Sequence, residues 1–139
     1  MAADILINID VDDLDRATAF YTAAFGLQVG RRFAAFAIEL TGGTSPIYLL
    51  AKAAGTAAGP GPTTVGHRRY VRHWTPVHLD FVVPDLEAAL KAALSAGANL
   101  EREPATHTWG RIALLADPFG HGLCLIEFLG RGYDEITTA

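Results

Sequence analysis

The strongest constraint on the fold is an internal repeat with an offset of 72 residues. Residues 6–17 align with residues 78–89 without a gap, so that Asp13-Leu14 coincides with Asp85-Leu86. Two later pairs of segments follow in the same order: 25–27 with 96–98, after one deletion, and 47–50 with 123–126. Because three segments recur in one order, the sequence indicates two copies of a single supersecondary unit.

Each copy opens with a segment that has the pattern of a β-strand. In residues 5–11 and 77–83, apolar side chains occupy every second position, which is the period of a strand. We expect the apolar faces to pack on the helices that follow. The opposite faces then carry the polar residues of these segments: Asn8, Asp10, His78 and Asp80.

A helix follows each of these strands. Apolar residues recur there at helical spacing. Asp13 and Asp85 are suited to the N-cap, where a short carboxylate accepts hydrogen bonds from the first turn. Gly26 and Gly97 fit the left-handed residue that ends a helix.

Three further strands are predicted in each copy, near 27–32, 34–41 and 46–51, and near 99–102, 109–116 and 122–128. Each unit therefore reads βαβββ, and the fold class is α+β. We expect a single domain over residues 1–139: module 1 at about 1–51, a linker at 52–76, module 2 at about 77–128 and a C-terminal tail at 129–139.

Composition narrows the class of protein. The 139 residues are 50% hydrophobic, which suffices for the core of one ordinary domain, and the formal net charge of −4 does not favour nucleic acid or an anionic membrane as partner. The single cysteine excludes an intramolecular disulfide and fits a reducing compartment. No signal peptide and no apolar run of about 20 residues is present. We expect a cytoplasmic protein that does not bind membranes.

The linker has two interpretations. It begins as an Ala/Gly/Pro tract and ends in the basic and aromatic stretch 67–74. That stretch would stack on a planar ligand or pair with an anionic one. Alternatively, its aromatic residues anchor a solvated crossover to the body of the protein.

In their order and spacing, these motifs resemble the vicinal oxygen chelate superfamily, which includes glyoxalase I, extradiol dioxygenases, fosfomycin-resistance enzymes and bleomycin-resistance proteins. The matching segments are 12–17, 20–21 and 25–27 in the first copy, and His78, 84–86, 109–111, 117–120 and 125–127 in the second. The resemblance implies that each module curls a mixed sheet into half of a cup, with the helices on the outside and the active site enclosed.

The resemblance also implies four metal-ligand positions, two in each module. They fall on Leu6, Tyr48, His78 and Cys124. Only His78 is an ordinary ligand of the family, because leucine cannot coordinate a metal and a phenol with a pKa near ~10 replaces a carboxylate poorly. We therefore predict no metal and no other cofactor.

Other roles for this region remain open. His78 and Cys124, helped by Asp80 or His121, offer donors suited to a divalent metal such as zinc. Cys124 would act as a nucleophile only with a base such as His78 nearby. A lone cysteine is more commonly a small buried hydrophobe.

The pocket implied by the resemblance has an apolar floor, from Leu6, Tyr48, Cys124 and Ile126, with a few directional groups, as is usual for small-molecule sites. The predicted ligand-binding residues are Asn8, Tyr48, His78, Asp80, Trp109, Arg111 and Cys124. Alternatives exist for several of them. Asp80 would pair with Arg111 across the sheet, and Trp109 would belong to the core. His121 is expected to face water, and Glu127 to face away from the cup.

Three functions follow from these residues. The first is a small-molecule-binding protein of the glyoxalase/bleomycin-resistance type with a degenerate metal site, which sequesters an apolar or aromatic ligand. The second is an enzyme, a lyase or dioxygenase of the vicinal oxygen chelate type, with non-standard metal ligands or with His78 as acid/base. The third is a domain that binds a protein partner. The resemblance further implies a homodimer.

Overall fold

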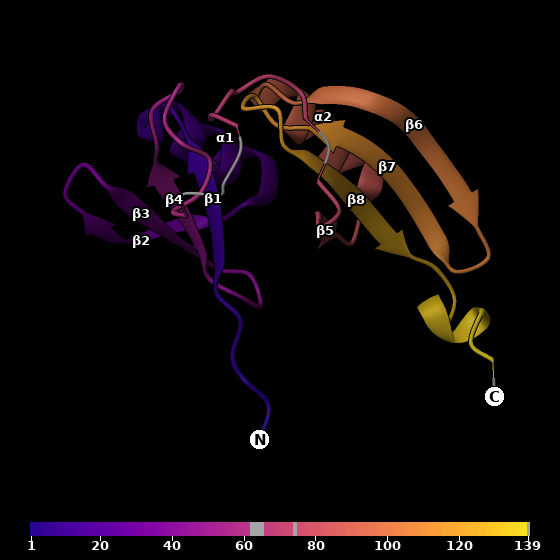
Figure 1. Cartoon of the computed structure of the whole chain (residues 1–139). Helices are drawn as coiled ribbons and strands as arrows, with labels where there is room; N and C mark the ends of the chain where they lie inside the picture. The colour runs from indigo at the N-terminus through magenta and orange to yellow at the C-terminus, as the bar shows by residue number, and fades with distance from the viewer. Residues whose placement is uncertain (62–65, 74, 139) are drawn as a thin grey trace. The chain divides into compact units, whose positions relative to one another are not determined.

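The computed structural model describes residues 1–61, 66–73 and 75–138, and its contacts divide the chain into two compact units, Met1–Val71 and Arg72–Ala139. Each unit contains one βαβββ module (Figure 1). The prediction of an α+β fold built from two such modules is confirmed.

Module 1 forms a four-stranded mixed sheet in the order β1-β4-β3-β2. Strand β1 runs parallel to β4, and the other neighbours are antiparallel. The elements are β1 (Ile7–Val11), α1 (Leu14–Phe25), β2 (Gln28–Phe33), β3 (Ala37–Thr41) and β4 (Ile47–Ala51).

Module 2 repeats this arrangement in the order β5-β8-β7-β6, again with one parallel pair, β5 and β8. The elements are β5 (Leu79–Val82), α2 (Leu86–Ala96), β6 (Asn99–His107), β7 (Gly110–Ala116) and β8 (Gly122–Phe128). A short 3-10 helix, η1 (Gly132–Glu135), follows in the tail.

The strand register agrees with the sequence repeat residue by residue. Asn8 pairs with Tyr48 in module 1, and Asp80 pairs with Cys124 in module 2. The alignment of segment 47–50 with segment 123–126 is therefore correct without a shift, and Tyr48 and Cys124 occupy corresponding positions.

The helix caps are the predicted ones. Asp13 accepts from the amide of Arg16 at 3.0 Å, and Asp85 accepts from the amide of Ala88 at 3.1 Å. Both caps have an extended backbone, at φ −143° and −141°. Gly26 and Gly97 then end the helices in the left-handed conformation, with φ of 68° and 117°.

Each helix packs on one face of the sheet of its own module. In module 1 the buried contacts come from Val11, Ala17, Phe20, Tyr21, Ile38, Leu40, Ile47 and Leu49. In module 2 they come from Leu86, Leu90, Ala93, Ala113, Leu115, Phe119, Leu123 and Leu125. The apolar alternation in the strands thus packs one side of each sheet against its helix and leaves the other side for different chemistry.

Strand boundaries differ from the predictions at several points. The first strand of each module starts two residues later than expected, and the side chains of Ile5 and Val77, placed on apolar faces by the sequence, are 68% and 81% exposed. Strand β6 extends through the predicted loop 103–108 as far as His107, because β7 pairs with it across two register shifts. Backbone hydrogen bonds to β7 thus hold this polar segment in a strand, although its sequence alone predicts a loop.

The linker residues in unit 1 make contacts that anchor the linker to module 1. The side chain of Arg68 pairs with Asp10 at 2.8 Å, and the hydroxyl of Tyr70 donates to the carbonyl of Lys52 at 2.6 Å. Trp74, which closes the basic and aromatic stretch, lies outside the described residues. Within the described chain, no helix is long and apolar enough to cross a bilayer.

Candidate functional site

Three predicted site residues meet at the start of the parallel strand pair in module 2. Asp80 on β5 lies opposite Cys124 on β8, and His78 immediately precedes β5. The Nε2 atom of His78 is 3.2 Å from Oδ1 of Asp80. One ligating atom from each of the three residues lies within 4.8 Å of the others. The structure therefore assembles His78, Asp80 and Cys124 into one cluster.

The Cys124 thiol is held in its protonated form. Burial, followed by the charge of the Asp80 carboxylate and a hydrogen bond to it, raises the pKa of Cys124 to about 11. The thiolate is the nucleophilic form of cysteine, so this environment opposes a nucleophilic role. Asp80 instead accepts from the thiol on one side and faces the His78 imidazole on the other.

A small hollow of about 100 Å³ opens beside the cluster in unit 2. Its lining is mostly apolar and includes Leu114, which lies on the same face of the sheet as Cys124. The other lining residues are Arg72, Thr75, His78, Glu101, Leu115, Gly122, Leu123 and Cys124. Drug-sized ligands occupy pockets of roughly 300–1,000 Å³. A hollow of this size accommodates one ring or one end of a ligand.

Arg72 and Glu101 form the charged rim of the hollow. The guanidinium of Arg72 binds both carboxylate oxygens of Glu101, at 2.6 and 2.9 Å. This pairing raises the pKa of Arg72 and lowers the pKa of Glu101. The guanidinium also lies against Gly122, where a Cβ atom would come within 2.6 Å of Nη2. The rim is therefore neutral as a pair, and a side chain at position 122 would displace the guanidinium.

Sequence reasoning did not select these rim residues. Arg72 belongs to the basic stretch of the linker, but its partner Glu101 is 29 residues away on β6. The charge pattern alone gave no pairing between them.

His121 does not simply face water, as the sequence suggested. Its Nδ1 atom is 3.0 Å from Nε2 of His73, and its side chain is half-buried. The buried carboxylate of Asp117 organises this turn by accepting from the amides of Phe119 and His121. The segment that leads into module 2 is fixed to this turn, and His121 is not in the His78 cluster.

Arg111 and Glu127 lie on the face of the sheet that carries α2. Arg111 pairs with Glu87 of that helix at 2.6 Å, and a Glu127 oxygen accepts from the amide of Leu86 at 2.9 Å. Glu127 thus faces away from Cys124, as alternation predicted. Arg111 shares the face of Glu127 because the two are register partners, so the structure does not bring it to the cluster or pair it with Asp80.

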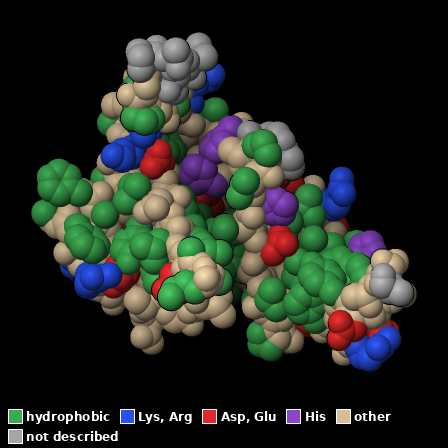
Figure 2. Space-filling view, turned by 60° about the horizontal axis from the view of Figure 1, so that its bottom comes forward, with side chains coloured by type: hydrophobic (Ala, Val, Ile, Leu, Met, Phe, Trp, Pro, Cys, Tyr) green, Lys and Arg blue, Asp and Glu red, His purple; other side chains and the backbone are tan. Residues whose placement is uncertain are grey.

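Trp109 lies in the turn between β6 and β7, within an aromatic group. It stacks on His107 with ring centroids 5.3 Å apart and contacts Tyr133 of the tail at 5.2 Å. Phe128 also packs on Tyr133, at 4.7 Å. Figure 2 shows the hydrophobic side chains gathered over this C-terminal part of module 2. Trp109 docks the tail, and the structure does not place it at the hollow.

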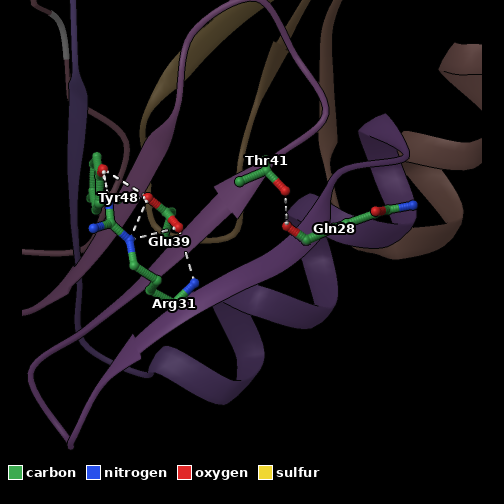
Figure 3. A network of polar contacts seen from close by, with 5 residues as sticks. All are labelled: Gln28, Arg31, Glu39, Thr41 and Tyr48. Carbon is green, nitrogen blue, oxygen red and sulfur yellow. Dashed lines mark hydrogen bonds and ion pairs between the residues drawn. The ribbon is translucent and has the colours of Figure 1, made fainter.

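In module 1 the corresponding face carries a closed polar network. The Tyr48 hydroxyl donates to Glu39 at 2.8 Å, and Nη2 of Arg31 donates to Glu39 at 2.6 Å and to Tyr48 at 3.1 Å (Figure 3). Hydrogen bonds, chiefly from the Arg31 side chain, lower the pKa of Glu39 to about 2. Tyr48 is thus engaged with partners that the sequence analysis did not select.

The other two predicted positions of module 1 are exposed. Asn8 is the register partner of Tyr48, and its side chain is open to solvent. Leu6 precedes β1 and is 59% exposed, beside residues 44–46 of the loop before β4. Neither residue joins the network of Tyr48.

Comparison with known proteins agrees with this architecture. The model of the glyoxalase-like domain family matches residues 6–126 of the chain. The chain belongs to the glyoxalase-like domain family. This match spans both modules, so the family assignment rests on the whole repeat.

Among curated proteins, this glyoxalase-like domain is similar to the anthracycline biosynthesis protein DnrV of Streptomyces peucetius. The two are 32% identical over 128 residues, which cover 91% of the chain and 42% of DnrV. The chain spans about two fifths of the length of the curated relatives that it matches.

Two solved structures share the fold at lower identity. A glyoxalase/bleomycin resistance protein/dioxygenase family enzyme from Burkholderia phytofirmans PsJN has a TM-score of 0.68 at 22% identity, covering 91% of this chain and all of that one. The fosfomycin resistance protein FosX from Listeria monocytogenes has a TM-score of 0.67 at 15% identity, covering 93% and 95%. The prediction of a vicinal oxygen chelate relative is confirmed.

The divalent ion that the superfamily implies does not fit the residues at its four positions. Leu6 has no donor atom, and Tyr48 is engaged with Glu39 and Arg31. Module 1 therefore supplies no metal ligand at these positions, and we derive no chemistry through an ion.

Proposed function

We propose that this glyoxalase-like domain binds a planar, largely apolar small molecule without a metal, and that one ring of the ligand enters the module 2 hollow. The observation that carries this proposal is the hollow itself, with aliphatic walls next to the His78–Asp80–Cys124 cluster. An apolar cavity with a few fixed polar groups is the usual composition of a small-molecule site.

The name of a curated relative supports a planar aromatic ligand. DnrV is an anthracycline biosynthesis protein, and anthracyclines contain fused aromatic rings. The apolar lining around Leu114 suits the flat edge of such a ring system.

Calorimetry and thermal shift with 2-naphthol test this proposal in the presence of EDTA. We expect binding, with a rise in melting temperature that grows with naphthol concentration. Leu114→Trp should fill the hollow and abolish binding, whereas Leu94→Trp on the exposed side of α2 should bind like the wild type. Binding that requires added metal, or that survives Leu114→Trp in a folded protein, would contradict the proposal.

The second candidate is a glyoxalase- or dioxygenase-like enzyme in which His78 acts as acid or base. The contact of His78 with Asp80 favours this candidate, because a carboxylate that orients an imidazole is a common arrangement for proton transfer. Turnover of a hemithioacetal or of catechol that is lost in His78→Phe would support the enzyme. The binding proposal predicts no turnover of either compound.

The expected homodimer and cytoplasmic location remain predictions, as does the role for a protein partner. Light scattering on the purified chain tests the first of these. A dimer would give twice the 14.8 kDa mass of the chain.

A further inference from the structure

We infer that the hollow selects ligands with a hydroxyl group on the ring, which donates a hydrogen bond to Nδ1 of His78. This inference rests on the proposed function, since it concerns the chemistry of the same ligand. Its basis is the contact of Asp80 with Nε2 of His78, which favours one tautomer of the neutral imidazole.

Asp80 determines which nitrogen of His78 carries the proton. An ionised carboxylate only accepts hydrogen bonds, and its Oδ1 atom is 3.2 Å from Nε2 of His78. The proton of the neutral imidazole is therefore favoured on Nε2, which leaves a lone pair on Nδ1. The Cys124 thiol reinforces this arrangement, because it also donates to Asp80 and keeps the carboxylate in place.

The rest of the hollow offers little to an anionic ligand. The guanidinium of Arg72 is bound to both oxygens of Glu101, and the Thr75 hydroxyl donates to the carbonyl of Val77 at 2.7 Å. His78 lines the hollow and is 42% exposed. Among residues 1–61, 66–73 and 75–138, Asp80 is the only ion-pair partner of His78. The imidazole is thus the group best placed to bind a polar substituent of the ligand, and it accepts a hydrogen bond from a donor.

An apolar hollow with one hydrogen-bond acceptor should bind a phenol more tightly than the corresponding methyl ether. A hydroxyl on the ring satisfies Nδ1, whereas a methoxy group brings only an acceptor and leaves the lone pair without a partner. A ring that shields Nδ1 from water without donating to it binds less favourably, so the discrimination should be about tenfold. Asp80 acts here as a positioning residue, because it reaches the ligand only through His78.

Paired titrations with 2-naphthol and 2-methoxynaphthalene test the inference. The wild type should bind the naphthol about tenfold more tightly. In His78→Phe, which keeps a ring but has no nitrogen, the affinities should become equal, with that for the methoxy compound nearly unchanged. Equal affinities in the wild type, or an undiminished preference in His78→Phe, would overturn the inference and leave the binding proposal intact. Failure of both probes to bind would overturn the binding proposal as well.

Nitrogen NMR of histidine-labelled protein tests the role of Asp80 separately. The His78 signals, assigned by their loss in His78→Phe, should report a proton on Nε2 in the wild type. Asp80→Asn should shift the tautomer towards a mixture and reduce the preference for naphthol, and Asp80→Glu should restore both. A wild-type proton on Nδ1, or a tautomer unchanged in Asp80→Asn, would overturn the inference.

Discussion

Module 1 places Tyr48 and Glu39 opposite one another on β4 and β3, and module 2 places Cys124 and Leu114 at the corresponding positions on β8 and β7. The backbone plan is the same, but the consequences differ. In module 1 a carboxylate, a phenol and a guanidinium satisfy one another. In module 2 an aliphatic residue replaces the carboxylate, and a hollow lies beside the thiol.

The comparison teaches that duplication of the fold does not duplicate the site. Register and helix caps are the same in both modules because they set the backbone, whereas the face of each sheet opposite its helix carries different side chains at corresponding positions. Module 1 uses that face for an ion pair with a hydrogen-bonded tyrosine. Module 2 keeps its polar groups next to an apolar space, which is why we assign the ligand to module 2.

The largest expected effect is on the free energy of unfolding, and it comes from buried leucines that the two modules share. Leu49 on β4 and Leu125 on β8 occupy corresponding positions and are both 0% exposed. Leu49→Ala and Leu125→Ala should each reduce the free energy of unfolding by about 3 kcal/mol, because each leaves a cavity in a packed core. Urea denaturation measures both, with Leu94→Ala on the exposed side of α2 as the control. A loss below about 1 kcal/mol for one leucine would break the equivalence of the two cores.

The next effect is a loss of stability at high pH, which we expect from Cys124 in module 2. Since the folded state raises the pKa of Cys124 from 9.0 to about 11, it binds a proton more tightly than the unfolded chain. This contribution to stability is present below pH 9 and is lost as the pH rises towards 11. It is on the order of 2 kcal/mol. Denaturation of wild type and Cys124→Ala at pH 7 and pH 10.5 measures it. An equal pH dependence in both proteins would contradict the assignment.

Module 1 should respond at the opposite end of the pH scale. The folded state lowers the pKa of Glu39 from 4.5 to about 2, so its contribution is present above pH 4.5 and is lost as the pH falls towards 2. The stability difference between wild type and Glu39→Gln should therefore shrink over this range. Leu114→Gln, at the corresponding position of module 2, is the matched control. A difference that stays constant from pH 5 to pH 2.5 would show that Arg31 does not hold the carboxylate.

The smallest effect compares the helix caps. Asp13→Ala and Asp85→Ala should each reduce stability by about 1 kcal/mol, because each removes the acceptor for an amide of the first turn. Helix α2 has a second acceptor, since Glu127 binds the amide of Leu86, whereas the corresponding residue of module 1 is Ala51. We expect Asp85→Ala to be the milder change until Glu127→Ala is added. A milder effect for Asp13→Ala would reverse this part of the comparison.

The sequence predicted the features that depend on local pattern. The repeat located the two modules, and the short carboxylates at Asp13 and Asp85 marked the helix starts. It also selected His78 and Asp80, which share the polar face of residues 77–83, and the family resemblance added Cys124. These predictions needed only spacing along the chain, which the strands and helices preserve.

The remaining features depend on which strands become neighbours. Arg31 and Glu39 meet only through the pairing of β2 with β3, and Arg72 reaches Glu101 across 29 residues. The face of Arg111 is set by its register with Glu127, and Trp109 lies in the turn before β7. Long-range partners of this kind leave no periodic signal in one sequence.

A crystal structure of the protein, purified without chelator and soaked with 2-naphthol, tests the central claim most directly. The account predicts the naphthol ring against Leu114 in the module 2 hollow, with its hydroxyl at Nδ1 of His78 and no ion nearby. A cation held by three or more protein donors at His78, Asp80 and Cys124, or a naphthol bound elsewhere, would contradict it.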